Sequence, residues 1–197
     1  SDLCPAMFQE CWSLIYVNFL NQNIKKIPVD CFDTCGLLSI TIPSSVTEIA
    51  DGAFHSTFYL ERVNLNEGLE SIGNRSFENS NSIKELKFPS TLKSIGEKSF
   101  YETSSLVKLE LNDGLETIGE NAFYNCSNLT TVTLRKKLKS IGERAFKSSG
   151  LTSIDIPGSV ESIGQQAFKD CKDLKSVTLR EGLKSICSEA FSSSGFE

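Results

Sequence analysis

The sequence predicts an α/β repeat solenoid, built from about eight similar units that each contribute one strand to a parallel sheet. The first observation behind this prediction is the spacing of phenylalanine along the 197 residues. Nine phenylalanines recur at intervals of 22 to 24 residues: Phe8, Phe32, Phe54, Phe77, Phe100, Phe123, Phe146, Phe168 and Phe191. This self-similarity is typical of repeat architectures, in which a lone unit cannot bury its apolar columns but a stack of units can.

The second observation is a strand pattern that begins five or six residues after each phenylalanine. It reads Leu-x-x-(Val/Ile/Leu)-x-(Leu/Ile/Phe), as in residues 60–65 and 129–134. Its last four positions alternate between apolar and polar residues, which favours a short strand. Because every unit runs in the same direction, the strands must stack in parallel. Eight strands about 4.8 Å apart give a sheet roughly 35 Å across.

The third observation is a phrase that ends on the phenylalanine itself. It reads Ile-Gly-x-x-Ala-Phe in residues 141–146, and it recurs with small changes at 72–77, 95–100, 118–123 and 163–168. We expect it to form a helical or 3₁₀ turn on the side opposite the strands. The remainder of each unit then returns the chain behind the sheet.

Composition excludes several classes of function. The net charge is −5 and the 20 basic residues are evenly spread, which argues against a nucleic-acid partner. No apolar run approaches the roughly 20 residues that span a bilayer, so we expect no direct membrane insertion. The single histidine, His55, shows no nucleophile beside it in a catalytic pattern. We therefore predict no enzyme activity, no catalytic residue, no cofactor and no metal site.

The seven cysteines occupy repeat positions that otherwise hold small residues. Four follow a column phenylalanine by three residues and three take the glycine or alanine position: Cys11, Cys35, Cys126 and Cys171, then Cys4, Cys31 and Cys187. We expect mostly reduced packing residues, because buried free cysteine behaves as a small hydrophobe. A capping disulfide within the N-terminal four stays open. Glycosylation of the sequons at Asn74, Asn125 and Asn128 stays open too.

The combination of Leu-x-x-Val-x-Leu with Ile-Gly-x-x-Ala-Phe-x-x-Cys resembles the BspA-like (Treponema-type) leucine-rich repeat family over nearly the whole chain. The resemblance implies a leucine-rich-repeat horseshoe, with a concave parallel sheet and short helical or 3₁₀ turns on the convex side. It also implies a non-enzymatic, adhesin-like module at the cell surface or secreted, whose partner is a host extracellular or cell-surface protein. The alternative is a cytoplasmic scaffold, or a regulatory domain of a larger signalling protein.

Residues 1–197 are expected to form a single leucine-rich-repeat domain, cut from a longer array at residues 196–197. Phe196 stands where the first leucine of the next unit belongs. Neither end shows the polar cap that a solenoid needs, which predicts end-to-end self-association.

The alternating polar positions of the strands are expected to line the concave face. Charges of opposite sign follow one another down this face, as in Arg62, Glu85 and Lys108. Two interpretations stay open: a strip that binds a protein, or cross-strand ion pairs worth about 0.2–1 kcal/mol each. The predicted partner-binding residues are Tyr16, Asn18, Arg62, Asn64, Glu85, Lys87, Lys108, Glu110, Arg135 and Arg180.

Overall fold

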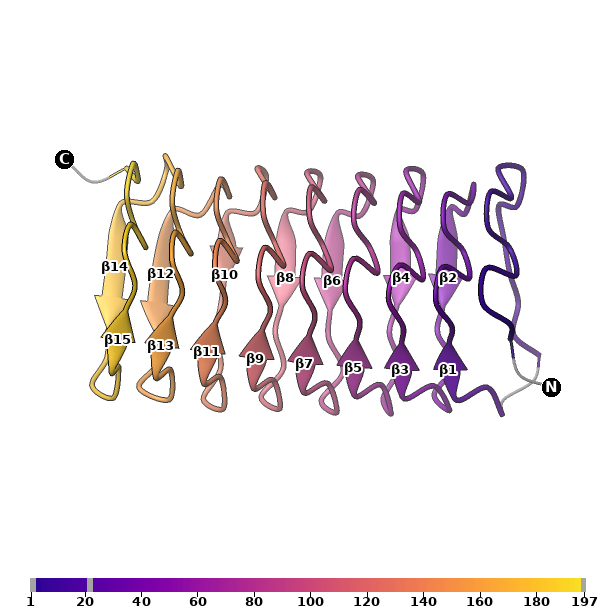
Figure 1. The fold of residues 1–197 in the computed structure, drawn as a ribbon, viewed down its shortest axis with the longest axis horizontal. Coiled ribbons are helices and arrows are strands. Elements are labelled where there is room, and N and C mark those ends of the chain that lie inside the picture. The colour runs from indigo at the N-terminus through magenta and orange to yellow at the C-terminus, as the bar shows by residue number, and fades with distance from the viewer. Residues whose placement is uncertain (1–2, 21–22, 196–197) are drawn as a thin grey trace.

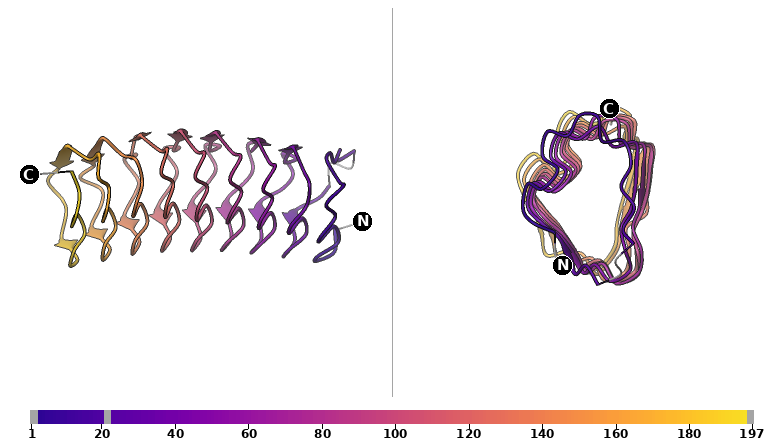
Figure 2. Two further views of the ribbon diagram at one scale, coloured as in Figure 1. Left: turned by 90° about the horizontal axis from the view of Figure 1, so that it is seen from above. Right: turned by 90° about the vertical axis from the view of Figure 1, so that its right-hand side faces the viewer.

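A computed structural model of the protein describes residues 3–20 and 23–195. Successive coils of the chain lie side by side in sequence order, with the two termini at opposite ends of the row (Figure 1). Seen along the row, the coils superpose on one closed outline (Figure 2). The predicted repeat solenoid is therefore confirmed. The row is nearly straight in these views, without the horseshoe curvature that the resemblance implied.

The predicted strand pattern forms seven strands, which lie behind the coils in Figure 1. They pair in parallel, but in three separate pieces rather than in one sheet. The pieces are β2 (Ser39–Thr41) with β4 (Arg62–Asn64); β6 (Glu85–Lys87) with β8 (Lys108–Glu110) and β10 (Thr131–Val132); and β12 (Ser153–Ile156) with β14 (Ser176–Leu179). In the first unit the pattern makes only an isolated bridge between Tyr16 and Ser39.

A second parallel sheet, which the sequence did not predict, lies on the near side in Figure 1. Its eight strands are two residues long and form one continuous sheet in chain order. They are β1 (Lys26–Ile27), β3 (Glu48–Ile49), β5 (Ser71–Ile72), β7 (Ser94–Ile95), β9 (Thr117–Ile118), β11 (Ser140–Ile141), β13 (Ser162–Ile163) and β15 (Ser185–Ile186). The isoleucine of the Ile-Gly phrase is thus a strand residue that points into the core.

The prediction of helical or 3₁₀ turns is wrong, because the described residues contain no helix. These residues therefore include no helix that could cross a membrane. The backbone shows why. Each column phenylalanine is flanked, two residues before and two residues after, by a residue with φ between 50° and 64°. Left-handed residues interrupt a right-handed helix. The described coils carry no helix on either side, so neither side needs the wider spacing that would fan the stack into a horseshoe.

The backbone of each phenylalanine segment forms hydrogen bonds to the next coil rather than within a helix. The amides of Arg75, Phe77 and Asn79 donate to the carbonyls of Glu97, Ser99 and Tyr101, at 2.7–2.9 Å. The same three bonds recur from each of the first eight phenylalanine turns to its successor, at 2.7–3.1 Å. We call this array the turn ladder.

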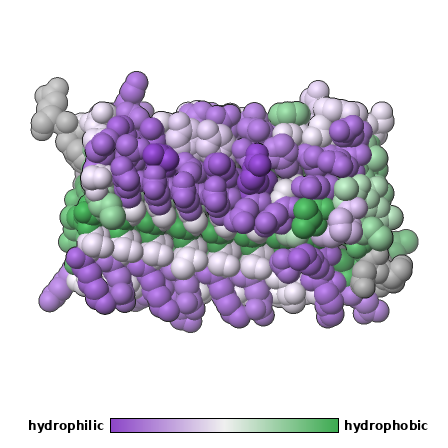
Figure 3. All heavy atoms as spheres, viewed as in Figure 1, coloured by the Kyte–Doolittle hydropathy of each residue, from purple (hydrophilic) through white to green (hydrophobic). Residues whose placement is uncertain are grey.

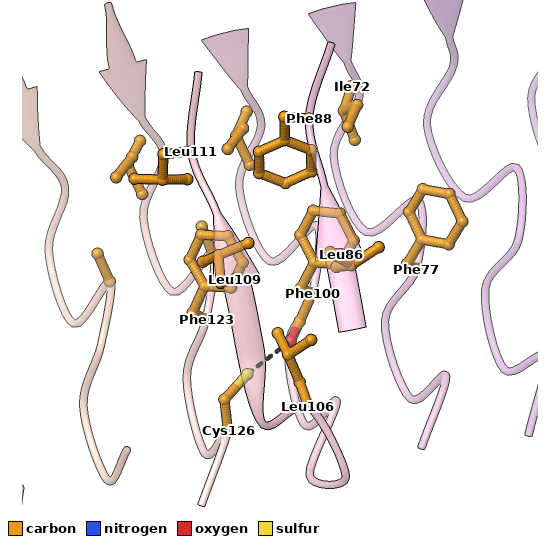
Figure 4. Packing of buried hydrophobic residues seen from close by; sticks show 14 of the residues in the cluster. Ile72, Phe77, Leu86, Phe88, Phe100, Leu106, Leu109, Leu111, Phe123 and Cys126 are labelled. Atoms are coloured by element: carbon orange, nitrogen blue, oxygen red, sulfur yellow. Dashed lines mark hydrogen bonds between the residues drawn. The ribbon is translucent and has the colours of Figure 1, made fainter. Parts of the chain in front are cut away.

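The core is a set of columns that run the length of the stack. The nine phenylalanine rings stack face to face, with centroids 5.0–5.5 Å apart and planes within 8° of parallel. Figure 4 shows Phe77, Phe100 and Phe123 in this row, with Leu86 and Leu109 from the strands packed beside them. Burial of these repeated side chains is the main source of stability.

Glycine in the Ile-Gly phrase permits the close approach of neighbouring coils. A Cβ on Gly119 would lie 2.6 Å from the carbonyl carbon of Gly96, well inside contact distance. Gly142 and Gly164 meet the preceding coil in the same way. The position after the isoleucine therefore favours glycine where neighbouring coils approach most closely.

Candidate binding face

The predicted binding residues lie on one side of the solenoid, which we call the strand face: the outward side chains of the seven strands β2 to β14 and of the Tyr16 bridge. Eight of the ten are exposed, whereas Glu110 and Arg135 are half-buried. Tyr16 exposes 63% of its surface. Accessibility therefore does not eliminate any predicted residue.

The largest grouping of these residues surrounds a hollow between β4 and β6, where the strand ladder is interrupted. The hollow has a volume of about 560 Å³. Six of the ten predicted residues line it: Arg62, Asn64, Glu85, Lys87, Lys108 and Glu110. We call it the central hollow. The structure thus assembles more than half of the predicted set around one break in the sheet.

A second hollow, of about 750 Å³, lies at the other interruption, between β10 and β12. Arg180 lines it, together with Lys136 and Asp155, which the sequence did not single out. Tyr16 and Asn18 line a third hollow of about 320 Å³ near the first coil. The predicted residues therefore belong to separate places along the strand face rather than to one site.

The charges of the central hollow are arranged differently from the predicted cross-strand ion pairs. The strand register places Glu85 beside Lys108 and Lys87 beside Glu110. Lys108 nevertheless pairs with Glu110 of its own strand, with 2.6 Å between Nζ and Oε1. The hydrogen bond from Lys108 lowers the pKa of Glu110, and Glu110 raises the pKa of Lys108.

Three of the predicted charged residues around the central hollow are left for other partners. Among the ion pairs of the described residues, none involves Arg62, Glu85 or Lys87. The interpretation of the alternating charges as cross-strand ion pairs therefore does not hold at the central hollow, where neither Arg62 with Glu85 nor Lys87 with Glu110 forms an ion pair. On an extended strand, residues two apart point the same way, so Lys108 and Glu110 can meet without crossing to the next strand.

The two remaining arginines are fixed by the protein itself. Arg180 donates two hydrogen bonds to Asp155, at 2.8 and 2.6 Å, in the bidentate geometry of a guanidinium–carboxylate pair. Nε of Arg135 donates to the carbonyl of Leu111 at 3.1 Å. Both side chains are held in place, but part of their hydrogen-bonding capacity is already used.

A polar cluster that the sequence did not reveal lies on the phenylalanine turns. Nδ1 of His55 donates to Asp33 at 2.8 Å, and Nε2 of His55 lies 3.5 Å from the Ser56 hydroxyl. Burial acts to raise the pKa of Asp33, but hydrogen bonds from Gln9, His55 and Thr34 outweigh it and lower the pKa. The signal was present, because Gln9, Asp33 and His55 each follow a column phenylalanine directly.

This cluster ties three coils together and lacks the features of a hydrolytic site. Ser56 is only 8% exposed, and its amide donates to the carbonyl of Glu78 rather than pointing into a cleft. A nucleophile needs an accessible oxygen and a place for the reacting carbonyl. The arrangement is that of an intercoil hydrogen-bond network.

All seven cysteines carry free thiols, and Cys31, Cys35, Cys126 and Cys171 are buried. Burial raises the pKa of Cys31 to about 12 and that of Cys35 to about 11. A thiol at such a pKa is neutral and unreactive at physiological pH. Across the part of the chain that the structure describes, no three His, Cys, Asp or Glu side chains gather as a metal site requires.

Several solved structures resemble this chain. A leucine rich cell surface protein from Faecalibacterium prausnitzii A2-165 is 30% identical, with a TM-score of 0.72. The match covers 78% of this chain but 42% of that protein, so the chain spans less than half of its length. A leucine-rich repeat protein from Bacteroides ovatus ATCC 8483 is 25% identical, with a TM-score of 0.62, over 98% of this chain and 67% of that one.

The leucine-rich repeat protein of T. pallidum is also similar, at 26% identity and a TM-score of 0.69, over 76% of this chain and 70% of that one. No curated protein sequence matches the chain. The family model of the BspA type leucine-rich repeat region matches residues 2–112 and 93–197, in 6 copies. Together with the stacked coils and the phenylalanine column, this match shows that the chain belongs to the BspA-type leucine-rich repeat family.

Proposed function

We propose that the chain is a non-enzymatic, adhesin-like protein-binding module of a cell-surface protein, and that it engages its partner through the strand face. The observation that carries this proposal is the central hollow, where Arg62, Glu85 and Lys87 stand exposed without an ion pair among the described residues. The similarity to a protein described as a cell surface protein supports the location. The partner we propose is a host extracellular or cell-surface protein.

The interruptions of the strand face create hollows that a partner's side chains can occupy. No strand ladder joins β4 to β6 or β10 to β12, and a hollow lies at each interruption. At such a break the facing strands make no ladder with each other, as at the edge of a sheet. Arginine is also enriched among the residues that dominate protein interfaces. The central hollow therefore combines a concave shape, charges without an ion pair and an interrupted strand ladder.

The partner's surface should carry an acidic group for Arg62 and Lys87, with a donor for Glu85. Paired charges such as Lys108 and Glu110 would then lie at the rim, where they affect the rate of association more than the affinity. Tyr16 and Asn18, near the first coil, and Arg135 and Arg180, toward the other end, would extend the contact along the strand face.

The test is a binding screen against purified host extracellular-matrix and cell-surface proteins, followed by variants. Arg62→Glu with Lys87→Glu is expected to weaken the identified partner at least tenfold, about 1.4 kcal/mol. The matched control is Lys25→Glu with Lys172→Glu, which changes the net charge equally at exposed positions outside the hollow. Equal affinities of the two double variants would place the site elsewhere. Absence of any binder in the screen would contradict the binding function.

A further inference from the structure

The face opposite the strand face, which holds the short strands, carries a column of alternating charge. It lies two residues before the isoleucine of each short strand, from β5 to β15. Glutamate and lysine alternate there without exception: Glu70, Lys93, Glu116, Lys139, Glu161 and Lys184. All six side chains are 46–71% exposed. We call this set the charge column.

Within one chain the charge column is grouped into three pairs. Lys93 bonds Glu70 at 2.8 Å, Lys139 bonds Glu116 at 3.0 Å, and Lys184 bonds Glu161 at 2.9 Å. Each pair uses one ammonium proton and one carboxylate oxygen. An ammonium has three protons and a carboxylate two acceptor oxygens, so every member keeps capacity for a second partner.

The side chains directly beside the charge column are small, so they leave room for another molecule to approach it. The next residue in each coil is small: Ser71, Ser94, Thr117, Ser140, Ser162 and Ser185. In five of the six coils a glycine, without a side chain, follows the isoleucine; in the last coil Cys187 takes its place. Figure 3 shows this side of the molecule as a hydrophobic stripe between two hydrophilic bands, running along most of its length.

The order of the charges is self-complementary. Read backwards, Glu-Lys-Glu-Lys-Glu-Lys becomes Lys-Glu-Lys-Glu-Lys-Glu, the opposite sign at every position. A closed dimer requires a two-fold axis, and two orientations of the axis place the charge column of one copy over that of the other. An axis along the solenoid puts like charges together. An axis across the solenoid puts every lysine over a glutamate.

We propose that this face binds a second copy of the chain, with the two solenoids antiparallel and charge column against charge column. The arrangement pairs Glu70 with Lys184 of the second copy. It likewise pairs Lys93 with Glu161, and Glu116 with Lys139, each twice by symmetry. The interaction surface is distinct from the strand face and from the solenoid ends. A dimer would therefore leave the central hollow free for a different partner.

The association is weak and salt-sensitive. Exposed ion pairs contribute little each and are screened by salt. On the far side of the stripe, Glu120 comes near Glu143 of the second copy, which opposes binding. Arg144, paired with Glu143 at 3.0 Å in its own chain, offsets part of this repulsion. The alternation thus sets the orientation and register of the pair more than its strength.

The test exchanges every sign in the column. The reversed variant carries Glu70→Lys, Lys93→Glu, Glu116→Lys, Lys139→Glu, Glu161→Lys and Lys184→Glu. It keeps the net charge and all three pairs within the chain, so it is expected to fold with unchanged stability. Against itself it is again complementary. Against the original chain, every position meets its own sign.

Association is measured by sedimentation and by energy transfer between differently labelled chains, at low and high ionic strength. The original chain and the reversed variant are each expected to dimerise at low ionic strength and dissociate at high. The mixed pair is expected to bind at least tenfold more weakly. The Arg62→Glu, Lys87→Glu variant should dimerise like the original chain.

Two outcomes overturn the proposal. One is an original chain that stays monomeric at low ionic strength up to its solubility limit. The other is mixed pairs that form as readily as matched ones, which would place self-association at the solenoid ends or on another face. If the reversed variant fails to fold, the single pair exchange Glu116→Lys with Lys139→Glu replaces it. That variant should then bind the original chain more weakly than the original chain binds itself.

Discussion

Neighbouring coils are joined differently on the two long sides of the solenoid, the turn side and the strand side. On the turn side, three backbone bonds per coil and the stacked phenylalanine rings run without interruption through the described coils. On the strand side the sheet is divided into three pieces, with hollows at both divisions. Register and spacing are therefore set by the turn side. The strand side tolerates gaps, which makes it suitable for a variable surface.

The largest expected effect breaks the continuous side. Phe100→Ala removes a ring that stacks on Phe77 and Phe123 at 5.2 and 5.3 Å. Loss of burial and the cavity left behind should reduce the free energy of unfolding by about 3–5 kcal/mol. Chemical denaturation measures this, with exposed Val107→Ala as the control, expected within about 0.5 kcal/mol. A loss below about 1 kcal/mol would show that the column does not hold the coils together.

A smaller effect should follow from filling the glycine column. Gly119→Ala places a methyl group 2.6 Å from the carbonyl carbon of Gly96, which must move. Forced overpacking of this kind is expected to cost about 1–3 kcal/mol. Thr117→Ala, an exposed change two residues away, is the control for the same thermal or denaturant measurement. Equal stabilities would mean that the coil spacing relaxes freely, contrary to a register set by the turn side.

The two sides can be compared directly with one type of substitution. Ser148 has φ 59° on a phenylalanine turn, and left-handed backbone costs a non-glycine residue about 1–2 kcal/mol. Ser148→Gly should therefore stabilise the protein, by about 0.5–1 kcal/mol after the entropy cost of glycine. Ser153→Gly, in β12, should destabilise it by a similar amount, because a strand offers no such relief. Denaturant midpoints that shift in the same direction would refute this difference.

The smallest effect concerns the exposed carboxylates on both sides. Hydrogen bonds from lysine or arginine lower the pKa of Glu110, Asp155 and Glu161. A carboxyl group whose folded pKa is depressed stabilises the fold above its unfolded pKa of about 4 and loses that contribution as the pH falls further. The melting temperature is therefore expected to be flat near neutral pH and to fall slightly below about pH 4. A rise on acidification would contradict these ion pairs.

The sequence predicted the features that burial repeats in every unit. The phenylalanine column and the strand core, with residues such as Val63 and Leu86, could be read from spacing alone. The short sheet could not, because two residues are too few to show alternation. The left-handed turns were mostly hidden too. Glycine or asparagine, which signal such turns, stand only at Gly52, Asn79, Asn121 and Asn125, whereas residues such as Arg75 and Lys98 hold the other positions.

The candidate site was predicted in composition but not in arrangement. Exposure of Arg62 and its neighbours followed from strand alternation. The division of the strand face did not, because no residue type marks where β4 fails to pair with β6. The sequence also could not predict which carboxylate pairs with Lys108, since this depends on whether its long side chain turns along its strand or across to the next strand. The charge column could not be predicted, because the sequence pattern indicates helical turns on that face.

The turn ladder gives the turn side of the molecule an electrical direction. All three of its bonds in each coil donate toward the next coil, so their peptide dipoles add along the solenoid axis, as they do along a helix. On this side, a segment that joins the C-terminal coil must offer acceptors, and one that joins the N-terminal coil must offer donors. On the short sheet, amides such as that of Gly73 donate toward the preceding coil instead. A cap must therefore match a different hydrogen-bond pattern on each side, and the two caps of such an array are not interchangeable.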